Sequence, residues 1–97
     1  MTKQKFKKIL EQNKLYFAGT TYGRSGWTRF NAFYMSNNKL VPLWVEESLY
    51  WDKKHNCYNC LSIGSNRLVI ILLDIGEKLG LEFTEIKQNY HFLSEES

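Results

Sequence analysis

The sequence lacks the features of a membrane-spanning or secreted protein. Its 97 residues contain no run of 18 apolar residues, so no transmembrane helix is predicted. The charged start Met1–Lys5 is not followed by an apolar segment of signal-peptide type, so we expect no secretory leader. Two cysteines without an export signal are typical of free thiols in a reducing compartment, and we expect a cytoplasmic protein.

Catalytic signatures are missing as well. The chain has no Gly-x-Ser-x-Gly elbow and no helix with paired metal-binding histidines. Asp52 and His55 fall in one loop and could pair, but no third residue completes a triad. The segment Gly23–Gly26 is too short for a phosphate loop and precedes a strand rather than a helix. We therefore predict that the protein is not an enzyme and holds no cofactor.

The two cysteines form a single Cys-x-x-Cys motif. Cys57 and Cys60, with His55 and the distant His91, supply four candidate zinc ligands. A second matched pair is absent, and residues i and i+3 of a strand point to opposite faces. A redox motif would open a helix, whereas a strand is predicted at this position. We therefore expect no metal and two partly buried thiols.

The chain has enough apolar residues to form the core of one folded domain. Hydrophobic residues make up 43% of the chain and aromatic residues 15%, which predicts a single domain over residues 1–97 with a real core. The segment Ser94–Ser97 is predicted to be a frayed tail.

Charge is distributed unevenly along the chain. Residues 1–54 carry ten basic and four acidic side chains, a balance of +6, while residues 55–97 have a balance of −3. A basic half could meet nucleic acid or an acidic protein. Alternatively, the two halves interleave in space and the asymmetry disappears.

The first half predicts a three-stranded antiparallel meander. Leu15–Tyr22 and Trp27–Ser36 alternate as strands across a glycine-bearing loop. Two asparagines after Ser36 suit a two-residue hairpin turn into a third strand, Leu40–Val45. Pro42 in that strand predicts a sheet edge or a bulge.

Two helices are predicted from apolar spacing. Thr2–Gln12 is short and basic, with Thr2 as its N-cap, and its apolar stripe consists of Phe6, Ile9 and Leu10. The longer helix begins after a cap at Ser65 or Asn66 and ends at Gly80. Its exposed side is expected to carry Arg67, Asp74, Glu77 and Lys78.

Two further segments complete the predicted sheet. Tyr58–Ile63 and Leu81–Ile86 have the length and alternation of short strands. The sequence therefore predicts an α+β fold, in which one main helix covers an antiparallel sheet of four to five strands and a short basic helix precedes them.

The loop from Tyr22 to Arg29 is the strongest candidate for binding. It combines two glycines, two arginines and an indole, and interface hot spots favour arginine and tryptophan. Strand alternation places Trp27 and Arg29 on one face. The alternative is that Trp27 and Phe33 belong to the core. The predicted binding residues are Arg24, Ser25, Trp27, Arg29, Phe33 and Trp51.

Two segments carry a resemblance to a known family. Ser25–Arg29 runs into a strand, and Ile63–Leu68 is a glycine-bearing turn that opens an apolar helix. Over roughly residues 15–80 this pattern resembles a family of small uncharacterised phage proteins. The resemblance implies a phage or prophage accessory protein, and no activity or residue role transfers with it. Eight asparagines and ten lysines against two alanines fit an A+T-rich genome of that kind.

Three functions follow as hypotheses. The first is a non-enzymatic, phage-type protein that binds and inhibits a host or anti-phage defence macromolecule by steric occlusion, for example a CRISPR-type or other nuclease. Its partner would be a protein or a nucleoprotein complex in the host bacterial cytoplasm. The second is direct nucleic-acid binding by the basic N-terminal half. The third is a small-nucleotide sponge.

Overall fold

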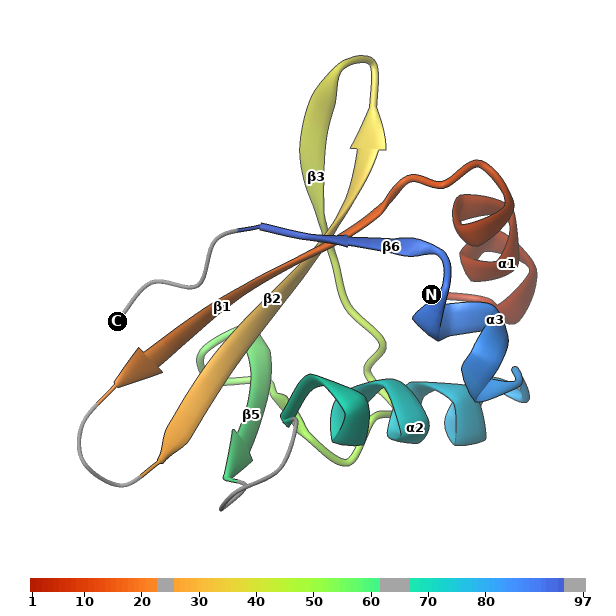
Figure 1. Cartoon of the computed structure of the whole chain (residues 1–97). Helices are drawn as coiled ribbons and strands as arrows, with labels where there is room; N and C mark the ends of the chain where they lie inside the picture. Colours follow the sequence, from red (N-terminus) through yellow and green to blue (C-terminus); the bar gives the residue numbers. More distant parts are fainter. Residues whose placement is uncertain (23–25, 62–66, 94–97) are drawn as a thin grey trace.

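The protein is an α+β fold in which the helices lie on one side of an open sheet (Figure 1). The computed structural model describes residues 1–22, 26–61 and 67–93, with only the backbone described for Thr21 and Tyr22. In chain order the elements are α1 Lys3–Glu11, β1 Leu15–Tyr22, β2 Trp27–Ser36, β3 Lys39–Leu43, β4 Trp51–Asp52, β5 Cys57–Leu61, α2 Arg67–Leu79, α3 Phe83–Lys87 and β6 Tyr90–Phe92. The predicted fold class is confirmed. The described residues form six strands, where four to five were predicted.

The sheet is organised around the long strand β2. One side of β2 pairs with β1 along its length, and the other side pairs with β5 over Trp27–Phe30 and with β3 over Ala32–Ser36. The strand order is β4-β5-β2-β1-β6, with β3 off this path. The predicted meander of β1, β2 and β3 is confirmed. The parallel pairing of β6 with β1 was not predicted.

Local sequence signals account for the first hairpin and the first helix. Asn37 and Asn38 have φ of 50° and 62°, the left-handed geometry that a two-residue hairpin requires. In the described residues β3 pairs with β2 alone, so Pro42 lies in an edge strand as predicted. The Thr2 hydroxyl accepts a hydrogen bond from the Lys5 N–H at 3.2 Å and caps α1.

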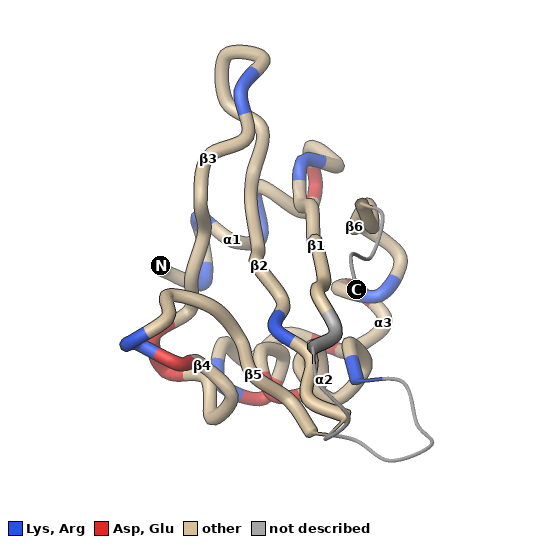
Figure 2. The backbone as a smooth tube through the Cα atoms, turned by 90° about the vertical axis from the view of Figure 1, so that its left-hand side faces the viewer, with Lys and Arg blue, Asp and Glu red and all other residues tan. Residues whose placement is uncertain are grey.

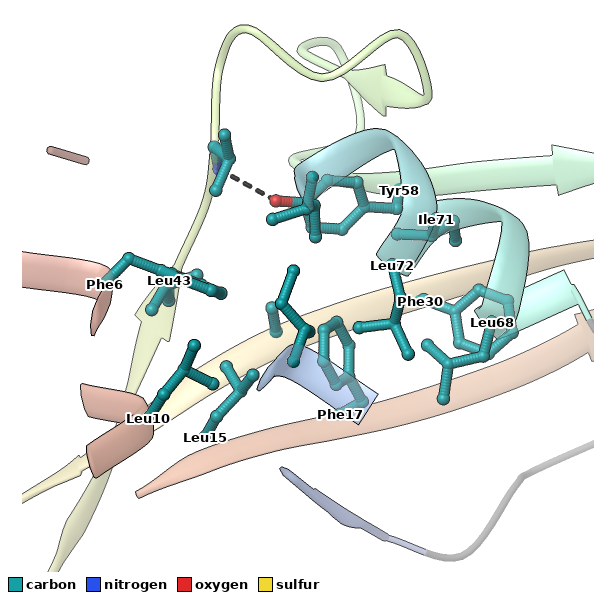
Figure 3. Packing of buried hydrophobic residues seen from close by; sticks show 14 of the residues in the cluster. Phe6, Leu10, Leu15, Phe17, Phe30, Leu43, Tyr58, Leu68, Ile71 and Leu72 are labelled. Carbon is teal, nitrogen blue, oxygen red and sulfur yellow. Dashed lines mark hydrogen bonds between the residues drawn. The ribbon is translucent and has the colours of Figure 1, made fainter. Parts of the chain in front are cut away.

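The core lies between the sheet and the helices. Leu15 and Phe17 of β1 and Phe30 of β2 point toward the helices, and all three are buried. Figure 3 shows Phe17 and Phe30 facing Leu72 of α2. Burying one such side chain contributes about 1.5–3 kcal/mol. The predicted stripe of α1, formed by Phe6, Ile9 and Leu10, is buried in this core, and α2 contributes Leu68, Ile71, Leu72 and Ile75.

The predicted strand Leu81–Ile86 is wrong, because the segment forms α3. Glu82 and Glu85 form a capping box, in which the Glu82 N–H donates to Glu85 Oε2 at 2.8 Å. The helical turn buries Ile86 completely. The alternation of apolar and acidic residues suggested a strand, but the capping box satisfies the backbone donors of a helix start.

The prediction that Asp74 marks the exposed side of α2 is also wrong. Asp74 is buried, because the loop after β3 folds over this part of the helix and supplies hydrogen-bond donors. The Ser48 hydroxyl and the Leu49 N–H both donate to Asp74 Oδ2. Glu77 is exposed as predicted.

The predicted end of α2 is confirmed. Gly80 has φ of 70°, as expected of the residue after the helix. The predicted caps Ser65 and Asn66 and the predicted tail Ser94–Ser97 lie outside the described residues.

Candidate binding groove

One face of the sheet is covered by none of the described helices. Figure 2 views this open face, with α1 and α2 behind the strands. Alternation along β2 buries Thr28 and Phe30 toward the helices and turns Trp27 and Arg29 to the open face. Trp27 is 37% exposed, so the prediction that Trp27 and Arg29 share a face is confirmed, and Trp27 is not a core residue.

A groove of about 680 Å³ begins at Trp27 and crosses toward β4. In the β2–β5 ladder Trp27 lies directly opposite Leu61, and Trp51 belongs to the neighbouring strand β4. The groove therefore joins two predicted binding residues that are far apart in the sequence. We call it the tryptophan groove, and its lining consists of Trp27, Leu49, Tyr50, Trp51, Asp52, Lys53, Lys54, Asn59 and Leu61.

Large apolar side chains are unusually exposed in the tryptophan groove. Leu49 is 74% exposed and Leu61 is 44% exposed, next to the partly exposed Trp27. A single exposed leucine is common, but apolar side chains that share one depression are typical of interaction sites.

Trp51 lines the groove from the edge strand β4, where it pairs with Tyr58 and its ring turns to the core side of the sheet. Its ring stacks on Trp44 at a centroid distance of 6.0 Å, and it meets the ring of Tyr58 edge-on at 5.2 Å. Tyr58 is completely buried, and its hydroxyl accepts a hydrogen bond from the Val45 N–H at 2.8 Å (Figure 3). The position of Trp51 is therefore set by packing against a fixed core residue.

The backbone of the Leu49 loop is anchored as well. Asp74 accepts hydrogen bonds from the Ser48 hydroxyl and, at 2.6 Å, from the Leu49 N–H. A smaller depression of about 200 Å³ is also lined by Leu49 and includes Leu73, which is 49% exposed. Leu49 thus lines two depressions from a loop that α2 holds in place.

The polar rim of the groove contains a satisfied carboxylate and two exposed lysines. Asp52 Oδ2 accepts a hydrogen bond from the Asn59 amide at 2.6 Å and lies 2.7 Å from His55 Nδ1. The hydrogen bond from His55 lowers the pKa of Asp52. The predicted pairing of Asp52 with His55 is confirmed. Since Asp52 is engaged within the rim, Lys53 and Lys54 are the charged groups offered to a partner.

The four candidate zinc ligands are not brought together. Cys57 and Cys60 are buried free thiols, and burial raises the pKa of both. His91 stacks on Tyr16 in another part of the sheet. Over residues 1–22, 26–61 and 67–93, no group of three or more His, Cys, Asp or Glu side chains could hold a metal ion.

Comparison with known proteins does not place this chain in a family. No protein-family model matches the chain, and no curated protein or solved structure matches it either. None of the described helices has the length and apolar character needed to cross a membrane. The function must therefore be inferred from the groove itself.

The other predicted binding residues lie outside the groove lining. Arg29 lies next to the groove on the open face, where its cross-strand neighbour on β5 is Asn59. Phe33 lies farther along β2, opposite Pro42 of β3. Arg24 and Ser25 fall outside the described residues.

Sequence reasoning missed two groove residues, Leu49 and Leu61. Leu61 could have been found by extending the strand alternation of β5, which turns it to the same face as Trp27. Leu49 carried no such signal, because its exposure depends on the contact of its loop with Asp74.

Proposed function

We propose that this protein is a non-enzymatic binding protein that docks a protein partner in the tryptophan groove and blocks that partner by steric occlusion. The observation that carries the proposal is the joint exposure of Leu49, Leu61 and Trp27 in one groove that Trp51 also lines. Burying such side chains releases about 25 cal/mol per Å² of apolar surface. Aromatic residues in a preformed depression are also the usual anchors of interfaces.

The charge of the rim indicates the chemistry of the partner. Lys53 and Lys54 are exposed beside an apolar floor. A matching surface would present an apolar side chain flanked by carboxylates. A typical partner buries about 800 Å² on each side of an interface, so contacts would extend from the groove onto the open face near Arg29.

The biological setting follows from the sequence resemblance to small phage proteins. The partner in this proposal is a host or anti-phage defence macromolecule, such as a CRISPR-type or other nuclease, alone or bound to its nucleic acid. Occlusion needs no catalytic residue on the inhibitor, since covering the working surface of the partner is sufficient.

The proposal is tested with matched glutamate variants. A tagged wild-type protein captures its partner from a bacterial host lysate, and the purified partner is then titrated against Leu49→Glu/Leu61→Glu and against Leu40→Glu. Leu40 is 40% exposed on β3 and lies outside the groove, so it controls for an added charge at an exposed leucine. We expect the groove variant to bind at least a hundredfold more weakly, equivalent to about 2.7 kcal/mol, and the control to stay within threefold.

The rim is tested separately with Lys53→Glu/Lys54→Glu. For an acidic partner the association rate should fall about tenfold at low salt, because rim charges act mainly on the encounter. A partner that binds the Leu49→Glu/Leu61→Glu variant with the wild-type Kd would contradict the proposed groove.

A further inference from the structure

Another depression lies at the opposite end of the sheet from the tryptophan groove. It has a volume of about 260 Å³ and is formed where α1 meets the hairpin of β2 and β3. Lys14 directly precedes β1, whereas Trp27 pairs with the last residue of β1. An eight-residue strand spans about 25 Å, so the two sites are separate. We call this depression the lysine pocket, and its polar lining consists of Lys5, Lys8, Gln12, Lys14, Tyr34, Ser36 and Asn37.

Three lysines from two parts of the chain line the lysine pocket. Lys5 and Lys8 lie one turn apart on α1, and Lys14 joins them from the start of β1. Among the described residues that line it, none is an aspartate or a glutamate. Like charges at this helical spacing repel one another by a few tenths of a kcal/mol, and a bound anion would remove that repulsion.

The neutral groups in the lysine pocket also suit an anion. The Asn37 and Gln12 amides and the Ser36 hydroxyl can donate hydrogen bonds to phosphate oxygens. Asn37 is held at a defined position by the hairpin turn. Lys5 Nζ lies 5.4 Å from the centroid of the Tyr34 ring, a cation–π contact that keeps this ammonium at the pocket.

The surroundings favour nucleic acid over a protein or a membrane. The apolar residues of α1 are buried in the core, so this helix has no apolar face to insert into a bilayer. The apolar lining residues are the buried Ile9 and the half-buried Met35, which offer little of the exposed apolar surface that anchors a protein interface. Clustered lysines with amide donors match the phosphate backbone, which dominates affinity in protein–nucleic acid complexes.

We infer that the lysine pocket binds the phosphate backbone of nucleic acid. The inference goes beyond the proposed function and does not depend on the tryptophan groove. If both sites act together, their separation fits a nucleoprotein partner, with protein at one end of the sheet and nucleic acid at the other.

The test compares two triple variants with the same change in net charge. Lys5→Gln/Lys8→Gln/Lys14→Gln removes the pocket charges, and Lys3→Gln/Lys7→Gln/Lys39→Gln removes three nearby exposed lysines outside the lining. Binding of fluorescently labelled 20-nucleotide DNA, single-stranded and duplex, is followed by fluorescence anisotropy between 50 and 200 mM salt.

Three phosphate contacts on duplex DNA should weaken wild-type binding about 40-fold over this salt range. We expect the pocket variant to bind at least tenfold more weakly at 50 mM salt with a much flatter salt dependence, and the control variant to stay within threefold. The Leu49→Glu/Leu61→Glu variant should bind DNA like wild type. DNA binding by this variant therefore tests the lysine pocket independently of the proposed role of the tryptophan groove.

Several outcomes would overturn the inference. Equal weakening of DNA binding in both triple variants would show that DNA binds to diffuse surface charge rather than to the lysine pocket. Displacement of DNA by 10 mM inorganic phosphate would show a site for small anions, and equally tight binding of a poly-glutamate peptide would show an acidic-protein site. Absence of wild-type binding to either DNA at 50 mM salt would refute it outright. Thermal unfolding of each variant, followed by circular dichroism, confirms that the compared proteins are folded.

Discussion

The tryptophan groove and the lysine pocket lie at opposite ends of the same strands and are built in opposite ways. The groove exposes apolar side chains, and two of its lining residues are held from the core, Trp51 by its contact with Tyr58 and Leu49 by its hydrogen bond to Asp74. The pocket exposes charge on α1 and a hairpin, and none of its three lysines is buried. A leucine side chain is more stable when it is buried, so it stays exposed only if its loop cannot move to bury it. A lysine ammonium group is stable in water, so it needs no such support. Exposed apolar surface therefore needs rigid support, and exposed charge does not.

The largest expected effect comes from removing the anchor of the groove. Asp74→Ala leaves the Ser48 hydroxyl and the Leu49 N–H without their acceptor. We expect the free energy of unfolding to fall by about 2–4 kcal/mol in urea denaturation, because buried donors lose their partner. Glu77→Ala, an exposed position on the same helix, should change the stability by less than about 0.5 kcal/mol. Equal stability of the two variants would show that the groove is not anchored through α2.

A smaller effect is expected from the other anchor, Tyr58. Tyr58→Phe removes the oxygen that accepts the hydrogen bond from the Val45 N–H. At neutral pH this change should cost about 1–3 kcal/mol in urea denaturation, since a buried donor is left without a partner. Tyr16→Phe, on the open face, should cost less than about 0.5 kcal/mol and serves as the control.

The Tyr58→Phe variant also tests how the stability of the protein depends on alkaline pH. Burial raises the pKa of Tyr58, so its phenol stays neutral in the folded state at a pH where it ionises in the unfolded state. In the unfolded state a tyrosine ionises at about pH 10. Its contribution to stability is complete below that pH and is lost as pH rises toward the folded pKa. Wild type should lose roughly 1 kcal/mol per pH unit above pH 10 from this group, and Tyr58→Phe should not. Burial of Cys57 and Cys60 adds a loss in the same direction, which both proteins retain. Parallel pH profiles would contradict the assignment.

The smallest expected effect belongs to the hairpin of the lysine pocket. Asn38 has φ of 62°, so Asn38→Gly relieves left-handed strain and should raise stability by about 0.5 kcal/mol in thermal unfolding. Asn31→Gly, at an exposed position within β2, should lower stability by roughly 0.5–1 kcal/mol instead. The lysine pocket should keep its DNA affinity in Asn38→Gly. Loss of that affinity would show that the turn geometry shapes the pocket.

Elements with local signals were predictable from the sequence. The Asn37–Asn38 turn, the Thr2 cap and the alternation of β2 depend on neighbouring residues, so the hairpin, the start of α1 and the division of β2 into two faces followed from them. The capping box of α3 was a local signal too, and it was overlooked in favour of apolar alternation. The parallel pairing of β6 with β1 had no local signal, because its partners are separated by most of the chain.

The candidate site was predictable in part. The sequence by itself determined that Trp27 and Arg29 share one face of a strand, because side chains alternate with a period of two. The tertiary structure decided that the face with Trp27 is the open one, that Trp27 lines one groove together with Trp51 and Leu49, that Asp74 is buried, and that the N-terminal lysines lie at the other end of the sheet. The physical reason is the range of the interactions. Backbone geometry and capping act over a few residues, whereas a groove forms where residues distant in sequence pack against one core.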